Sequence, residues 1–315
     1  MEHAAKLNLA EADVVRLLHP RALIARMEDA FRTRFPRVNI APRQHLKVSG
    51  GVFLIMSCFD PIPPALGMKL VTVRDHAAAG EDRVHATYLL LNPSTGEPVF
   101  SIAANHLTAL RTAATSAVAT EYLARKNSST LGIFGTGRLA RAHLTLMPLV
   151  RNFKKILVCG REPQASARFA SEMSSAFNGQ ILPADPPTLA RESNVICTCT
   201  TSRTPLFDGN DLQPGTHVNL VGAYEPEARE ADTQTMRRAR IFVDTYEGAH
   251  AEAGDILIPI GEGAISASHI LGDLHELLAG KKQGRTASEE ITVFKSVGCA
   301  LEDLAAAELL QPDAP

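Results

Sequence analysis

The chain has 315 residues, of which 45% are hydrophobic and 21% charged, and its formal net charge is -2. This composition is ordinary for a globular protein, and the length suits about two domains. A nearly neutral chain without a basic stripe gives no electrostatic basis for binding nucleic acid. No apolar run approaches the length of a membrane span, and the N-terminus lacks the pattern of a signal peptide. We therefore expect a cytoplasmic protein that does not bind membranes.

Five scattered cysteines predict reduced, mostly buried thiols rather than a disulfide framework. Cys197 and Cys199 form a C-x-C pair, but no second pair and no nearby histidine accompanies them. The pattern therefore predicts no metal site.

The first part of the chain, up to residue 118, has the pattern of one unit. An amphipathic helical pattern covers residues 10–35. Short turn signals then separate four segments that are typical of strands, so we expect an antiparallel or mixed sheet. These segments are residues 52–58, 66–73, 84–91 and 99–103.

From His106 the pattern changes to an alanine-rich helix that ends near Asn127, and strands and helices then alternate. This alternation predicts an α/β fold with a Rossmann-type, doubly wound parallel sheet. The expected strands are residues 130–134, 155–159, 194–198, 217–222 and 241–244, with a weak one at 181–182. The final segment, residues 286–310, predicts one long helix in which Thr286 and Glu289 form a capping box.

A phosphate-binding loop is predicted at residues 131–144, which read LGIFGTGRLARAHL. Gly135, Gly137 and Ala140 form a G-x-G-x-x-A pattern between an expected strand and an expected helix. Gly135 permits a tight turn, Gly137 lets the backbone approach a pyrophosphate, and the helix N-terminus favours an anion. We expect Gly135, Thr136, Gly137, Arg138 and Leu139 to bind a dinucleotide.

The end of the second strand of this domain bears on the choice of cofactor. Sites specific for NAD place an acidic residue there to bind the ribose 2′-hydroxyl, whereas this chain has Gly160 and Arg161. A guanidinium pairs with a 2′-phosphate. We therefore predict NADP(H) in preference to NAD(H), which stays an alternative. Thr198 and Val221, at the ends of later strands, are further expected cofactor contacts because cofactors bind at this edge.

The chain resembles the ornithine cyclodeaminase/mu-crystallin family along nearly its whole length. The segments that carry the resemblance are LGMKLVTV, STGEPVF, LTALRTAATSAVATEYLA, GTGRLA, VDTYEGA, GDILIPIGEG and GRTASEEITVFKSVGCALEDLAAA. The resemblance implies a homodimer of two-domain subunits. A substrate-binding and dimerisation domain would comprise residues 1–118 with 299–315, and an NAD(P)-binding Rossmann domain residues 119–298.

The resemblance also implies residue roles. Lys69 matches the active-site lysine, and its apolar neighbours favour a lowered pKa that suits proton exchange. Arg111 matches the arginine that binds the substrate carboxylate. Arg43 matches, less closely, a second arginine near that carboxylate. Thr112 lies on the cofactor side of Arg111, and Ser296 matches the residue that binds the nicotinamide carboxamide.

Two residues depart from the family pattern. Ornithine cyclodeaminases carry an aspartate shortly after the fifth strand as proton shuttle and amine partner, whereas this chain has Tyr224 there. A phenol donates a hydrogen bond but does not hold an ammonium as a carboxylate does. We treat Tyr224 as a candidate catalytic residue. His85 stands where a threonine is expected, and it is either an acid or base or a structural histidine.

These features predict an NAD(P)H-dependent reductase of α-imino acids, or the reverse amino-acid dehydrogenase, with a small amino or imino acid as substrate. One alternative is an ornithine cyclodeaminase, which returns the hydride and releases ammonia. Another is a non-catalytic binder that resembles mu-crystallin and keeps the cofactor. Retention of both Lys69 and Arg111 argues against the binder.

Overall fold

The computed structural model describes residues 7–76 and 82–311. The chain divides into two compact units, which we call unit 1 (residues 1–111 with 299–315) and unit 2 (residues 112–298). The predicted domain boundary at residue 118 and the division between the two units both fall within helix α3 (Asn105–Leu123). Residues 1–6, at the start of the segment considered for a signal peptide, lie outside the described residues.

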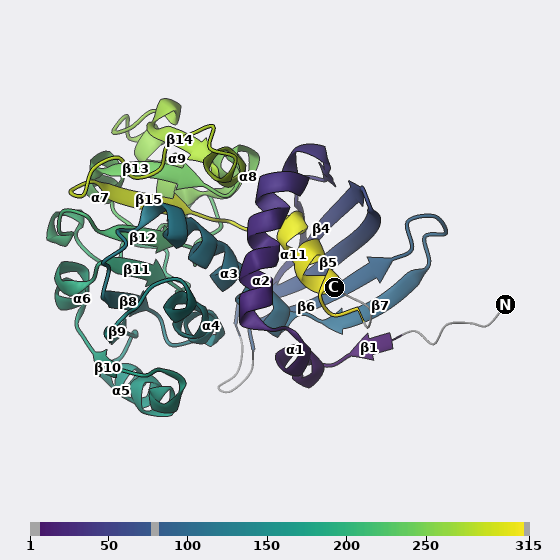
Figure 1. Cartoon of the computed structure of the whole chain (residues 1–315), viewed down its shortest axis with the longest axis horizontal. Helices are drawn as coiled ribbons and strands as arrows, with labels where there is room; N and C mark the ends of the chain where they lie inside the picture. Colours follow the sequence, from purple (N-terminus) through teal and green to yellow (C-terminus); the bar gives the residue numbers. More distant parts are fainter. Residues whose placement is uncertain (1–6, 77–81, 312–315) are drawn as a thin grey trace. The chain divides into compact units, whose positions relative to one another are not determined.

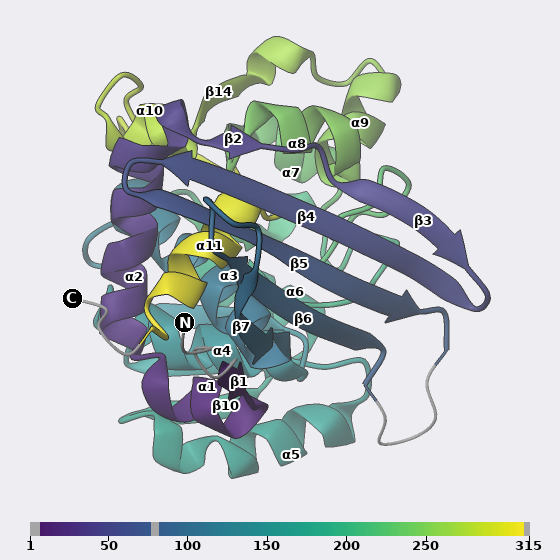
Figure 2. The same cartoon turned by 90° about the vertical axis from the view of Figure 1, so that its right-hand side faces the viewer.

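Unit 1 is built on a seven-stranded sheet, part of which faces the viewer in Figure 2. The strand order is β1-β7-β6-β5-β4-β2, and β3 also pairs with β4. The β1–β7 pair is parallel and the others are antiparallel, which confirms the expected mixed sheet. The strands are β1 (Leu7–Leu9), β2 (Asn39–Ile40), β3 (Gln44–Val48), β4 (Gly51–Pro61), β5 (Pro64–Arg74), β6 (Val84–Leu91) and β7 (Pro98–Ala103).

Side-chain alternation gives this sheet two unlike faces. On one face, Leu54, Val71 and Tyr88 are buried. Helix α11 (Ala300–Glu308) packs on β4, β5 and β6, and helix α2 (Pro20–Asp29) packs against α11 (Figure 2). The opposite face carries half-buried apolar side chains, namely Phe53, Ile55, Phe59, Leu66, Met68, Leu70 and Leu89.

The helical pattern predicted over residues 10–35 is present, but it is divided into several shorter helices. Helix α1 (Glu11–Leu17) ends before His19, and α2 begins at Pro20. A π-helical turn (Ala30–Arg34) and a 3-10 turn (Phe35–Arg37) follow. Pro20 explains the break, because proline lacks the N–H that a residue inside a helix donates but suits its first turn.

Unit 2 contains an eight-stranded sheet in which every neighbouring pair is parallel. The order β10-β9-β8-β11-β12-β15-β13-β14 confirms the predicted α/β fold (Figure 1). The strands read as apolar runs because a parallel sheet is covered on both faces. They are β8 (Thr130–Phe134), β9 (Lys155–Cys159), β10 (Gln180–Pro183), β11 (Val195–Thr198), β12 (His217–Leu220), β13 (Ala239–Val243), β14 (Ile270–Asp273) and β15 (Ile291–Lys295).

The final segment corrects the prediction of one long helix over residues 286–310. Its first part forms β15, a fully buried central strand, and its second part forms α11. The predicted capping box is also wrong, because Thr286 bonds to Glu290 instead. Its N–H donates to Glu290 Oε2 at 2.7 Å, and its hydroxyl donates to Oε1.

Short helices connect the strands of unit 2. Helix α4 ends at Leu146, just before the 3-10 turn that contains Pro148. The helices are α4 (Arg138–Leu146), α5 (Pro163–Glu172), α6 (Pro186–Glu192), α7 (Thr233–Arg238), α8 (Tyr246–Glu252), α9 (Gly254–Gly261) and α10 (Leu274–Leu278).

Three of the sequence expectations concern features of the whole chain. Within the described residues, no helix has the length and apolar character needed to cross a bilayer. Over the same residues, no group of three or more His, Cys, Asp or Glu side chains is placed to hold a metal ion. The five cysteines are all free thiols, four of them buried and Cys159 partly so.

Candidate active site

Lys69 lies in the middle of β5, on the sheet face that α11 covers. Its neighbours across the sheet are Met56 on β4 and Tyr88 on β6. The side chain is 2% exposed, and Nζ donates to Asp303 Oδ1 on α11 at 2.8 Å. The predicted lysine is therefore a buried ammonium that is paired with a carboxylate.

Arg111 joins the same cluster from helix α3. Its Nε donates to Asp303 Oδ1 at 2.9 Å, and its Nη1 donates to Glu302 Oε2 at 2.8 Å. Both acids are fully buried, and Arg111 is 4% exposed. Two charge-assisted bonds fix the plane of the guanidinium, and a single carboxylate oxygen joins it to Lys69.

Burial and charge shift the pKa values in this cluster. Burial, and then the positive charge of Arg111, lower the pKa of Lys69 to about 8, although Asp303 opposes them. Burial disfavours the charged form of Asp303, but Arg111 and Lys69 outweigh it and hold that pKa below its usual value. Burial also opposes the charge of Arg111, yet Asp303 and Glu302 raise its pKa. The arginine therefore stays a cation, while the lysine is able to exchange a proton near neutrality.

Arg43 and His85 lie in different surroundings. Arg43 precedes β3 and is half-buried, and its charge contributes to lowering the pKa of Lys69. His85 is exposed near the start of β6, opposite Thr72. The charge of Arg43 therefore acts on Lys69. His85 is exposed and is not part of the cluster.

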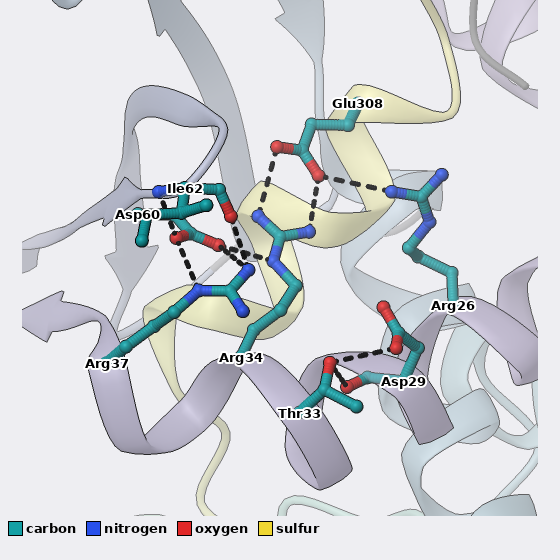
Figure 3. A network of polar contacts seen from close by, with 8 residues as sticks. All are labelled: Arg26, Asp29, Thr33, Arg34, Arg37, Asp60, Ile62 and Glu308. Atoms are coloured by element: carbon teal, nitrogen blue, oxygen red, sulfur yellow. Dashed lines mark hydrogen bonds and ion pairs between the residues drawn. The ribbon is translucent and has the colours of Figure 1, made fainter.

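The C-terminal end of α11 is anchored by a second set of ion pairs (Figure 3). Arg34 donates from both terminal nitrogens to Glu308, at 2.6 and 3.0 Å, and its Nε donates to Asp60 at 2.6 Å. Arg37 reaches the other oxygen of Asp60 at 3.0 Å, and Arg26 lies 3.5 Å from Glu308. Charged contacts at both ends of α11 therefore fix the helix that presents Glu302 and Asp303.

In unit 2, the predicted glycine loop forms a tight turn from β8 into the N-terminus of α4. Gly135 has a φ of 108°, and a Cβ there would lie 2.4 Å from the carbonyl oxygen of Cys199. Gly137 caps the N-terminus of α4, and a Cβ there would have no neighbour within 4 Å. The first turn of α4 is thus open to an anion, and these residues fit a dinucleotide cofactor. Thr136, Arg138 and Leu139 are half-buried beside them.

At the end of the second strand, Gly160 and Arg161 follow β9. The N–H of Gly160 donates to Ser166 Oγ at 2.7 Å, which fixes the turn into α5. Arg161 is exposed, and Glu162 is the N-cap residue of α5. The guanidinium is therefore the first charged group after this strand.

Glu230 joins the ends of β11 and β12, which carry the predicted contacts Thr198 and Val221. Its Oε2 accepts from the hydroxyl of Thr198 at 2.7 Å and from the N–H groups of Gly222 and Ala223 at 2.7 and 3.1 Å. Its Oε1 accepts from the backbone and the hydroxyl of Thr200. Burial, with Asp255 nearby, raises the pKa of Glu230.

Ser296 follows β15 and is held by Asp244, which follows β13. The Ser296 hydroxyl donates to Asp244 Oδ2 at 2.9 Å, and the N–H groups of Val297 and Gly298 donate to the same oxygen at 2.8 and 2.6 Å. The predicted helical position of Ser296 is wrong, but its location just beyond a parallel strand remains at the cofactor edge of the sheet.

Residues 5–314 match the model of the ornithine cyclodeaminase/mu-crystallin family. The chain belongs to this family. A Delta(1)-pyrroline-2-carboxylate reductase from Colwellia psychrerythraea is 39% identical over 225 residues, which cover 70% of this chain and 70% of the relative. The solved structure of Thermococcus litoralis Delta(1)-pyrroline-2-carboxylate reductase in complex with NADH and L-proline is 37% identical, with a TM-score of 0.93 and 96% of each chain covered. An archaeal alanine dehydrogenase dimer with bound NAD is 29% identical, with a TM-score of 0.91 and 97% and 94% covered.

Tyr224, the predicted catalytic residue, lies in unit 2. It directly follows Ala223, whose N–H donates to Glu230. Its side chain packs against the hydrophobic core of unit 2. Thr112 is the first residue of unit 2 and is half-buried. The structure thus brings Lys69 and Arg111 together within unit 1 and places Tyr224, Thr112 and the glycine loop in unit 2.

Sequence reasoning missed four buried acids that organise these groups, namely Glu302, Asp303, Glu230 and Asp244. A glutamate and an aspartate in an alanine-rich helix look like ordinary surface residues. The available signal was that Glu302 and Asp303 lie between apolar residues on both sides, in CALEDLAAA. Carboxylates in such surroundings need a buried cation as partner.

Proposed function

We propose that this protein is a nicotinamide-dependent reductase of cyclic α-imino acids, with a five-membered 2-carboxylated imine as the preferred substrate class. The observation that carries the proposal is the cluster in which one oxygen of Asp303 receives both Lys69 and Arg111. This contact supports the proposal because it brings an ammonium, which can donate a proton, beside a guanidinium, which can bind a carboxylate. The similar proteins from Colwellia psychrerythraea and Thermococcus litoralis are both named Delta(1)-pyrroline-2-carboxylate reductase, which agrees with this substrate class.

The proposed roles follow from the chemistry of the side chains. A bound nicotinamide supplies a hydride for the reduction, or accepts one in the reverse direction. Arg111 binds the substrate carboxylate, since a guanidinium matches its two oxygens. Lys69 gives a proton to the imine nitrogen, which its lowered pKa of about 8 favours. Arg43 adds positive charge near the carboxylate, and Tyr224 is a candidate hydrogen-bond donor to the substrate.

For the cofactor, we propose NADP(H) in preference to NAD(H). The first turn of α4 receives the pyrophosphate at Gly135 and Gly137, and the exposed Arg161 pairs with the 2′-phosphate. Related structures hold NADH or NAD, so the preference rests on Arg161 of this chain. The nicotinamide part of the cofactor contacts Ser296, Thr198 and Val221.

The test mixes the purified protein with NADPH or NADH and with five- and six-membered cyclic 2-carboxylated imines, and follows absorbance at the nicotinamide band. We expect stoichiometric oxidation of the cofactor and formation of the cyclic amino acid. Pyruvate with ammonia, a linear imine source, serves as the comparison substrate. Cofactor binding without oxidation by any imine would contradict the proposal and favour a non-catalytic binder.

L-Ornithine separates the reductase from a cyclodeaminase. A cyclodeaminase releases ammonia from ornithine without a net change in the cofactor, and it needs an amine partner in place of the family aspartate. Tyr224 packs against a hydrophobic core, which disfavours a charged partner there. We therefore expect no ammonia release; ammonia with unchanged cofactor would identify the lyase instead.

We also propose a homodimer that forms through the face of the unit 1 sheet that lies opposite α11. This face carries a row of half-buried apolar side chains, including Ile55, Met68 and Leu70, and a contiguous apolar surface favours burial against a partner. Light scattering measures the mass of the wild type and of Leu70→Lys. We expect a dimer for the wild type and a monomer for the variant, and a monomeric wild type would contradict the proposal.

A further inference from the structure

Asp303 is the charged group that Lys69 contacts directly. Its Oδ1 lies 2.8 Å from Lys69 Nζ and 2.9 Å from Arg111 Nε, so one oxygen holds two cations side by side. Its Oδ2 is buried and has no hydrogen-bond partner within the described residues. A buried carboxylate in this position both locates the ammonium and opposes the repulsion from the guanidinium.

We propose that Asp303 is a positioning residue that sets the place and the protonation of Lys69. The proposal rests on the proposed imine reduction, in which Lys69 is the proton donor. Asp303 does not touch the substrate in this scheme but acts through Lys69. Its negative charge keeps the ammonium protonated in a setting that otherwise favours the neutral amine.

The other groups around Lys69 do not supply this charge. Arg111 on α3 and Arg43 before β3 are cations, and both lower the pKa of Lys69. Tyr88 on β6 and Cys58 on β4 are buried, and burial raises the pKa of each, that of Cys58 to about 12, so both stay neutral near pH 7. Removal of the charge of Asp303 therefore leaves Lys69 facing two cations.

Glu302 provides a matched control on the same helix. It is also fully buried and bonds to Arg111, at 2.8 Å, and it accepts from the N–H of Cys299 at 3.0 Å. No ion pair joins it to Lys69 among the residues that the structure describes. Substitution of Glu302 thus removes a buried charge from the cluster without removing the partner of Lys69.

The experiment measures the pKa of Lys69 by NMR on protein labelled with ¹³C at the lysine ε-carbon, without cofactor or substrate. The signal is assigned by its loss in Lys69→Met. We expect Asp303→Asn to lower the pKa of Lys69 by about one unit or more, as loss of an opposite charge within hydrogen-bond distance does. We expect Glu302→Gln to shift it by less than about half of that. Equal shifts in the two variants would overturn the proposal.

Kinetics give a second readout. Reduction needs protonated Lys69, so kcat falls as the pH rises through its pKa. We expect Asp303→Asn to shift the decrease in kcat to lower pH. We expect Glu302→Gln to raise KM for the imine and to leave the pH of the kcat decrease unchanged. If kcat decreases at the same pH in Asp303→Asn as in the wild type, the proposal is contradicted. The NMR titration needs no substrate, so it tests Asp303 even where the wild type reduces no imine and the proposed function fails.

If circular dichroism shows that Asp303→Asn does not fold, Asp303→Glu is used to test the proposal. This variant keeps the charge but moves the carboxylate by one methylene. We expect a pKa of Lys69 within about half a unit of the wild type and a kcat at least about tenfold lower, because a displaced donor loses alignment. An unchanged kcat would show that the position of the carboxylate does not matter and would overturn the proposal.

Discussion

Arg111→Met tests the energetic role of the buried ion cluster. The substitution keeps much of the volume of the side chain but removes its charge and both of its bonds, to Asp303 Oδ1 and Glu302 Oε2. Asp303 keeps its 2.8 Å contact with Lys69. Glu302, which is fully buried, loses its ion pair with Arg111. Loss of one partner of a buried ion pair costs about 3–5 kcal/mol, and the retained lysine places our expectation near 3 kcal/mol.

The assay is urea denaturation followed by circular dichroism at neutral and acidic pH. Arg26→Met is the control, because Arg26 is 21% exposed and meets Glu308 at 3.5 Å, and such a pair contributes less than about 1 kcal/mol. A second substitution, Glu302→Gln, removes the stranded charge, so we expect the double variant to regain part of the loss. An unfolding free energy for Arg111→Met within about 0.5 kcal/mol of the wild type would refute the reasoning.

The pH dependence has a definite sign. The pKa of Asp303 is lowered in the folded protein, so the stability that this shift contributes is present above its unfolded value of about 4 and is lost as the pH falls through the folded value. In Arg111→Met the buried acids protonate more readily. The difference in stability between the variant and the wild type should therefore narrow as the pH falls below about 5.

Three further predictions concern unit 2. Gly135→Ala should lower the unfolding free energy by more than about 1 kcal/mol, because the φ of Gly135 is 108°. Gly137→Ala has open space around the new Cβ, so it should keep the stability of the fold but lose cofactor affinity. Denaturation measures stability and fluorescence titration measures affinity, and equal losses of stability in the two variants would count against this prediction. Arg161→Ala should weaken NADPH binding much more than NADH binding, as followed by nicotinamide fluorescence, and an equal loss for both would disprove the assignment. Glu230→Gln should cost about 1–3 kcal/mol, because an amide cannot accept all five of its bonds, and an unchanged urea midpoint would argue against this network.

The parallel sheet was largely predictable because its strands are apolar runs with clear boundaries. The segments at residues 130–134 and 155–159 have the observed bounds of β8 and β9. Strand β15 was mistaken for helix, since a short buried run such as Ile-Thr-Val-Phe-Lys between helix-forming neighbours satisfies either periodicity. Its place in the sheet depends on pairing with β12 and β13, which lie far away in the sequence.

The candidate site was predictable in part. The family resemblance identified Lys69 and Arg111, and their surroundings in sequence suggested burial. Their partner Asp303 lies 192 residues beyond Arg111, so no local pattern connects them. Charge balance in a buried cluster is a property of the tertiary structure, and the sequence therefore revealed the cations but not the acids that hold them.

Helix α11 follows the whole of unit 2 in the sequence yet completes unit 1. During synthesis, residues 112–298 are all made before Glu302, Asp303 and Glu308 exist. Until then Lys69, Arg111 and Arg34 have no acids of α11 to pair with, and the sheet of unit 1 has no cover on the face that α11 occupies. We therefore expect the cations of unit 1 to gain their partners, and this face of its sheet to be covered, only after α11 has been synthesised.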